Sequence, residues 1–303
     1  MAFMHQLEAG NRWRNRAIYI IFMVFFVAYF LYHLLKSFSH SLFFSKKDRL
    51  NFVIYGPYTA IYSLGLQDDQ NYVIPFSPDF HIDVPGNYGD YRIGSLGKLA
   101  KLDNKPELLQ KAFSYAASTL VDYYFYDNTD NLYYDLPKFA KGDIKLDVFK
   151  VLFFRSNTSI FDRLYLTLII SQKDKDKFRI FNSMTYKNQE EFSKNVLGLF
   201  YQKVFRTEKK NLQIIYGQNY HTANMINNLL EGSGVRVSDI NLSTSQIKPD
   251  EACVIVEEGK AFSLTAQSLA AFFGCQLKRS NPEVYDILFI LNNTENEWNI
   301  QNL

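Results

Sequence analysis

One uninterrupted apolar stretch near the start of the chain limits its architecture more than any other feature. Residues Ala17–Leu35 contain no Asp, Glu, Lys, Arg, Gly or Pro. A bilayer core about 30 Å thick is crossed by about 20 apolar residues in a helix, because each residue adds about 1.5 Å. We therefore predict a transmembrane helix over residues 17–35, after a short basic tail at 1–16.

Two other interpretations of this stretch compete with a membrane anchor. A buried core helix is normally shorter and apolar on one side only. A cleaved signal peptide has a shorter apolar region followed by small residues, whereas Phe38 and Leu42–Phe44 crowd the zone after this stretch. An uncleaved signal anchor fits better, with its C-terminal region extracytoplasmic. Basic residues flank both sides nearly equally, so the orientation depends on the short basic tail.

Composition excludes some classes of function. The formal net charge is +2, whereas nucleic-acid binders normally concentrate basic residues on one face, so we expect no nucleic-acid partner. Walker and dinucleotide loops, HExxH, CxxC and GxSxG are all missing from the sequence.

The two cysteines, Cys253 and Cys275, match no metal-ligand spacing. We predict free thiols, because a buried strand and a helix end need not approach within disulfide range.

The rest of the chain divides into two α/β regions after a juxtamembrane linker at 36–49. In the first region, 50–206, Asn51–Tyr55, Ala60–Leu66 and Tyr72–Pro75 read as strands. Pro106–Leu120 has a helical period, and an aromatic strand follows at Val121–Tyr126. A further helix is expected at 190–205.

A charged linker at 207–211 leads to the second region, 212–293, and a tail at 294–303. Its pattern predicts the order βαββαβ, with strands near 212–216, 235–242, 252–256 and 286–291. Helices are expected at 222–230 and 263–273, the latter with Ser263 as its cap and Gly274 as its stop. We expect this region to fold by itself.

Local candidates for chemistry are few. Asp79 and Asp83 flank His81 in a strand-like stretch, and strand alternation would place all three on one face. They could form a small cation site, or simply a solvated strand edge.

The stretch Tyr72–Leu96 resembles the core of the LytR-CpsA-Psr family. The matching pieces are Phe76-Ser77-Pro78-Asp79, Val84-Pro85-Gly86, Arg92-Ile93-Gly94 and Val121-Asp122-Tyr123-Tyr124. The second region is similar to the LytR C-terminal domain at Leu212–Gly217 and at Tyr285–Asn292, which reads YDILFILN. The resemblance spans most of residues 51–293.

The resemblance implies a signal-anchored envelope protein that transfers polymers from polyprenyl-pyrophosphate carriers to cell-wall glycan. Such chemistry needs magnesium and arginines, because charge develops on phosphoryl oxygens. The candidate catalytic residues are Asp79, Arg92, Arg155 and Arg163, and Asp79 is also the candidate metal ligand. Three positions depart from the family pattern: Pro78 replaces an arginine, Tyr58 an acid and Gly94 an asparagine.

Three functions remain open from the sequence. A catalytically degenerate protein could bind a wall polymer, a lipid-linked glycan or an envelope protein. An active magnesium-dependent phosphotransferase would bring Arg92, Arg155 and Arg163 together around Asp79. A structural membrane tether would bind no ligand.

Overall fold

The computed structural model describes residues 2–39, 41–127, 132–133, 146–174, 177–181, 183, 186, 188–243 and 251–300. The chain forms two compact units. The first unit contains Met1–Ser45 and Ser159–Tyr165, and the second contains Lys46–Thr158 and Leu166–Leu303.

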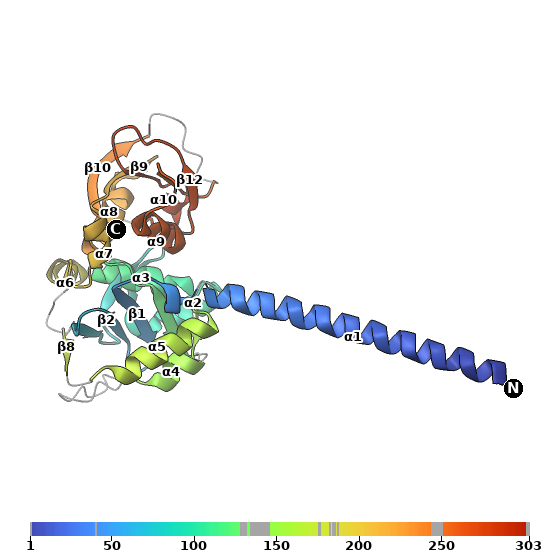
Figure 1. Ribbon diagram of the computed structural model, residues 1–303. Coiled ribbons are helices and arrows are strands. Elements are labelled where there is room, and N and C mark those ends of the chain that lie inside the picture. Colours follow the sequence, from blue (N-terminus) through green and yellow to red (C-terminus); the bar gives the residue numbers. More distant parts are fainter. Residues whose placement is uncertain are drawn as a thin grey trace. The chain divides into compact units, whose positions relative to one another are not determined.

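A single long helix, α1 (Ala2–Ser39), dominates the first unit (Figure 1). Its segment Tyr19–Ser39 has 21 residues and is wholly unburied, so it is long and apolar enough to cross a membrane. The helix therefore includes the predicted span, and residues 2–16 of the predicted tail before it are also helical. A short 3₁₀ turn, η1 (Leu42–Phe44), follows within the predicted juxtamembrane linker. The first unit also contains the beginning of α5 (Ile160–Gln172).

A six-stranded mixed sheet forms the first half of the second unit, in the order β7-β6-β1-β2-β3-β8. Its strands are β1 (Arg49–Tyr55), β2 (Ala60–Gly65), β3 (Asn71–Pro75), β6 (Tyr123–Tyr126), β7 (Arg155–Ser156) and β8 (Phe178–Ile180). Every residue of β1, β2 and β3 is buried, so the three predicted strands lie at the centre of the sheet. They form an antiparallel meander, and β6 and β8 extend it in parallel.

Helices and a small hairpin complete this half. The hairpin pairs β4 (His81–Val84) with β5 (Gly89–Arg92). The helices are η2 (Ile93–Ser95), α2 (Leu96–Leu102), α3 (Glu107–Ala117), α4 (Val148–Phe153), α6 (Gln189–Val196) and α7 (Lys203–Glu208). The single helix predicted over 190–205 is two, because Gly198 takes a left-handed backbone conformation at φ +75° between them. Phe76, Phe113 and Phe192 pack together in the core.

The second half of this unit is a five-stranded sheet in the order β10-β9-β13-β11-β12. Its elements are β9 (Asn211–Tyr216), α8 (Tyr220–Gly232), β10 (Arg236–Leu242), β11 (Val254–Glu257), α9 (Leu264–Phe273), β12 (Gln276–Arg279), β13 (Ile287–Ile290) and α10 (Asn293–Glu297). The predicted order βαββαβ lacks β12, whose four side chains are all exposed and give no apolar alternation. Within the predicted tail, α10 forms and Trp298 and Ile300 are buried.

The predicted caps of α9 are confirmed. The Ser263 side chain accepts a hydrogen bond from the Ala266 N–H at 3.1 Å, which satisfies one of the free donors of the first turn. Gly274 ends the helix in the left-handed region at φ +72°.

The two cysteines are joined by a disulfide, so the prediction of free thiols was wrong. Cys253 directly precedes β11 and Cys275 directly precedes β12, and these strands run in parallel with Val254 opposite Gln276. The two Cα atoms are 4.6 Å apart. The prediction failed because β12 was not expected, and only β12 brings Cys275 beside the start of β11.

The two halves of the second unit share buried contacts. The Ser233 hydroxyl, at the end of α8, accepts the Leu120 N–H at 2.8 Å, and the Ser233 carbonyl accepts the Gln202 N–H at 2.8 Å. Leu120 and Phe205, from the first half, belong to the apolar core of the second half. The linker predicted at 207–211 overlaps the end of α7, at Glu208, and the start of β9, at Asn211, and the division of the chain there stays a prediction.

Candidate functional site

The structure brings together two of the four residues predicted to form a site. Asp79 lies in the turn before β4, and Arg92 ends β5. The Arg92 guanidinium donates to the Asp79 carboxylate at 2.9 Å. The pair is open to solvent, since 61% of the Asp79 side chain is exposed. Ion pairs in such positions contribute at most about 1 kcal/mol, so this one is not required by the fold.

The other two arginines belong to different elements. Arg155 is exposed on β7, the strand at one edge of the six-stranded sheet, where it is paired in register with Tyr126. No hydrogen bond or ion pair joins Arg155 to Asp79 or Arg92, all three of which are described residues. Arg163 lies on α5 in the first unit, half-buried. Within the second unit, Asp79 is therefore paired with Arg92 and not with Arg155.

The β4–β5 hairpin carries further titratable residues beside the Asp79–Arg92 pair. His81 and Asp90 are 2.8 Å apart, next to the Asp79–Arg92 pair. Burial, and then the charge of Asp90, raises the pKa of Asp83. Among the residues that the structure describes, no three His, Cys, Asp or Glu side chains gather as a group that could hold a metal ion. The metal role of Asp79 stays a prediction.

The position that carries an asparagine in the resembled family is closed by backbone. The Gly94 N–H donates to the Pro78 carbonyl at 2.8 Å, and the Tyr133 N–H donates to the Gly94 carbonyl at 3.1 Å. A Cβ on Gly94 would lie 2.1 Å from the Tyr133 carbonyl oxygen and 3.1 Å from the Pro78 Cβ. Tyr55 supports this arrangement, since its hydroxyl donates to the Ile93 carbonyl at 3.1 Å. No side chain larger than hydrogen fits at residue 94 without displacing Tyr133.

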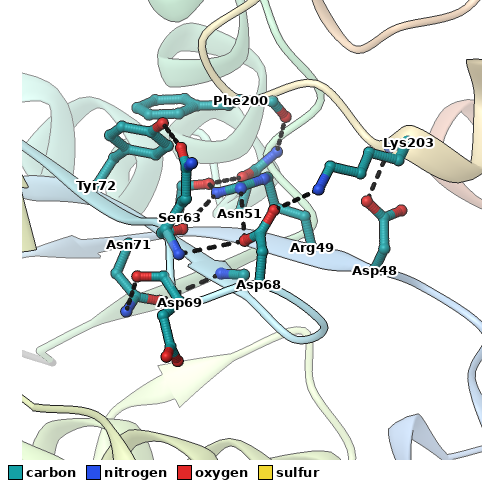
Figure 2. A network of polar contacts seen from close by, with 12 residues as sticks. Asp48, Arg49, Asn51, Ser63, Asp68, Asp69, Asn71, Tyr72, Phe200 and Lys203 are labelled. Atoms are coloured by element: carbon teal, nitrogen blue, oxygen red, sulfur yellow. Dashed lines mark hydrogen bonds and ion pairs between the residues drawn. The ribbon is translucent and has the colours of Figure 1, made fainter.

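A buried polar network that the sequence analysis missed runs through the centre of the six-stranded sheet (Figure 2). Asn51 is fully buried. Its amide nitrogen donates to the carbonyls of Leu120 and Phe200, each at 3.2 Å, and its amide oxygen accepts the Ser63 hydroxyl at 2.6 Å. Asn51 therefore holds the backbone at Leu120 and at Phe200 against the central strand β1. Both of these segments lead toward the second half of the unit.

Arg49 extends the same network toward the surface (Figure 2). Its guanidinium donates to the Ser63 hydroxyl at 3.0 Å and to Asp68 at 3.3 Å, and it lies over the Tyr72 ring at 5.3 Å. Asp68 also pairs with Lys203 of α7 at 2.8 Å. The sequence holds a signal for this network. Arg49 and Asn51 alternate within an otherwise apolar strand, which places both side chains on one face.

Asp48 fixes the start of α7. Its carboxylate accepts the N–H groups of Lys203 at 2.8 Å and Val204 at 3.2 Å, which are free donors in the first turn of a helix. Together with Asn51 and Asp68, this carboxylate holds the segment 200–204 against β1. The network is therefore a structural junction that fixes where the chain leaves the six-stranded sheet.

The Asp68 contacts predict a pH-dependent stability. Burial opposes ionisation of Asp68, but the hydrogen bond from Lys203 and the charge of Arg49 outweigh it and hold the pKa below its usual value. The ionised carboxylate therefore stabilises the fold at neutral pH, and this contribution is lost as the pH falls through the lowered pKa. Asp68→Asn should reduce the free energy of unfolding by about 1 kcal/mol at pH 7, since solvent screens a partly exposed pair. The difference from the wild type should begin to narrow at about pH 4, the ordinary pKa of an aspartate, and should close as the pH falls through the lowered pKa of Asp68.

Urea unfolding at several pH values would measure this difference. Asp69→Asn is the matched control, because the Asp69 side chain is 82% exposed and its distance to Lys173 is 3.7 Å. An Asp68→Asn effect that stays constant between pH 7 and pH 3 would show that the Asp68 charge plays no part.

Comparison with known proteins adds no relative. No protein-family profile, no curated protein and no solved structure matches this chain.

Proposed function

We propose that this protein is a single-pass, membrane-anchored binder of the cell envelope, with residues 50–303 on the extracytoplasmic side and no transferase activity. Its ligand class is a wall polymer, a lipid-linked glycan or an envelope protein, as the resemblance to LytR-CpsA-Psr proteins implies. The helix α1 supplies the anchor, since 21 of its residues form an unburied apolar segment.

The disulfide supports the proposed orientation. Disulfides persist in oxidising compartments outside the cytoplasm and are rare within it, where thiols are kept reduced. Cys253 and Cys275 are bonded to each other in the second unit. This unit therefore fits the extracytoplasmic side better than the cytoplasmic side, in agreement with the short basic segment that precedes the span.

The contact at Gly94 carries the proposal that catalysis is lost. Transferase chemistry on a pyrophosphate depends on donors aimed at the charge that develops on its oxygens. Where the resembled family has an amide side chain, the Tyr133 carbonyl oxygen occupies the space, 2.1 Å from the Cβ that any such residue would need. With Pro78 also unable to donate from its side chain, binding can persist while transition-state stabilisation is missing.

One observation favours the alternative of an active phosphotransferase. Asp79 and Arg92 form an exposed pair of the type that an incoming magnesium pyrophosphate could separate, with the carboxylate on the metal and the guanidinium on the phosphate. Asp79 and Arg92 are two of the four residues predicted for a transferase site. A substitution of Asp79 therefore distinguishes the two functions.

The test supplies the purified full-length protein with magnesium and a polyprenyl-pyrophosphate-linked glycan. We expect no release of phosphate and no glycan transfer, and we expect Asp79→Ala to leave the cellular role intact. Asp69→Ala is the control, because it removes another exposed carboxylate. Turnover that disappears in Asp79→Ala but survives in Asp69→Ala would establish the transferase. If the protein shows no turnover and is not retained on wall material or on lipid-linked glycan, the structural tether is the function that remains.

A further inference from the structure

The end of α1 and the beginning of α5 are held together within the first unit. The Asp162 carboxylate accepts the backbone N–H of Leu42 at 2.7 Å and the Ser159 hydroxyl at 2.8 Å. The Asp162 N–H in turn donates to the Ser159 hydroxyl at 3.1 Å, a reciprocal cap at the start of α5. The Asp162 carboxylate thus caps the start of α5 and also binds the chain just after the apolar segment of α1.

Aromatic contacts reinforce this junction. Phe38, at the penultimate position of α1, has its ring centroid 5.2 Å from that of Phe161, and Phe43 lies 5.1 Å from Tyr165. Phe44 also packs edge-on against Phe38 at 5.2 Å. The first turns of α5 therefore lie directly beside the end of the predicted span.

The outer side of α5 is apolar although it is exposed. Ile160 is 69% exposed and Leu164 is 45% exposed, and these two residues, four apart, share one face of the helix. Leu168, one turn further along α5, is 51% exposed, whereas Leu166 and Ile170 are buried. A helix that is apolar on both its buried side and its outer side needs a second apolar environment. The Phe44 side chain, which packs beside this junction, is also exposed, at 60%.

We propose that Ile160, Leu164 and Phe44 insert into the interfacial layer of the bilayer that α1 crosses, so that α5 begins as an interfacial helix. This inference rests on the proposed membrane anchor. The place of this helix identifies the bilayer as its second apolar environment, because Ile160 is adjacent in sequence to Phe161, which contacts the last turn of the span. Aromatic residues at the end of a span favour the headgroup level, and Lys36 in the last turn of α1 suits anionic headgroups. Helices of this kind bury their apolar face at the boundary of headgroups and acyl chains.

The consequence is a fixed attachment. A span followed by a flexible linker leaves the next element free to tilt, whereas a bonded junction with a second apolar contact holds the start of α5 at the membrane surface.

Site-specific fluorescence on the full chain tests this placement. Because the native cysteines are bonded to each other, a single added cysteine can carry a polarity-sensitive label. Leu164→Cys reports on α5, Tyr29→Cys on the middle of the span, and Val284→Cys is the matched control, an apolar residue 79% exposed in the second unit. Each variant is reconstituted at low protein density in vesicles of zwitterionic and anionic phospholipid in equal amounts, with or without brominated acyl chains.

The label at residue 164 should emit at shorter wavelength than the label at 284 and lose most of its emission to brominated lipid, while the control loses almost none. If residue 29 is quenched but residue 164 behaves like the control, the interfacial contact is refuted and the anchor stands. If neither residue 29 nor residue 164 is quenched, the anchor and this inference both fail. Shielding at 164 that appears only at high protein density would identify a second copy of the chain as the occupant and would also refute the proposal.

Discussion

Replacing Cys253 and Cys275 together by alanine is expected to lower the free energy of unfolding by about 3 kcal/mol. The bond joins residues 22 apart in sequence, and closing a loop of that length removes conformational entropy from the unfolded chain. It also clamps the starts of β11 and β12, and β12 is an edge strand with four exposed side chains. Urea unfolding of the two proteins, with the reduced wild type as control, measures the difference. A double variant as stable as the oxidised protein would contradict this role.

The same bond reports on the compartment. If the second unit lies outside the cytoplasm, a thiol reagent applied to denatured, unreduced cell extract should label neither cysteine, and reduction beforehand should expose both. Labelling of both without reduction would place this unit in a reducing compartment and would reverse the proposed orientation.

Gly232→Ala should destabilise the protein by a similar amount, about 3 kcal/mol. Gly232 is the last residue of α8, and a Cβ there would lie 1.8 Å from the Ser118 carbonyl oxygen. Ser118 ends α3 in the left-handed conformation, at φ +45°. Two helix ends therefore meet backbone to backbone, and neither can yield as the tip of a flexible side chain would. Thermal and urea unfolding both measure the loss.

Gly56→Ala is the control for Gly232→Ala. A Cβ on Gly56 would meet no atom within 4 Å, so this substitution should be nearly neutral. If both variants were equally stable, the close approach of α3 and α8 would be wrong, and the two halves of the second unit would pack less tightly than described.

Buried side chains from outside the segment bear on whether residues 212–293 fold alone. The core of the five-stranded sheet includes Leu120 and Phe205 before this segment and Trp298 and Ile300 after it. A fragment of 212–293 would lack all four buried side chains. Apolar burial is the main favourable contribution to folding, so a fragment extended to include α7 and residues 294–300 should be the more stable of the two.

Several features of this protein follow from its sequence alone, because they depend on neighbours within one or two turns of the chain. The 21-residue apolar segment of α1 needs only its length and composition. The strands β1, β2 and β3 follow from short β-branched and aromatic runs between turn residues. The ends of α9 follow from Ser263 and Gly274, whose effects are local. Asp79 and Arg92 likewise come together within one short segment, the turn before β4 and the β4–β5 hairpin, because they are only 13 residues apart.

Other features were decided only by tertiary structure, because their partners are far away in sequence. The strand β12 has no apolar pattern of its own and exists because β11 offers it an edge, and the disulfide depends on that pairing. Asn51 is satisfied by carbonyls 69 and 149 residues later. Tyr133 closes the space at Gly94, and Asp162 binds the backbone of Leu42 120 residues earlier. Hydrogen bonds and steric contacts act over a few ångströms in space, and no local pattern states which distant segments the fold will bring within that range.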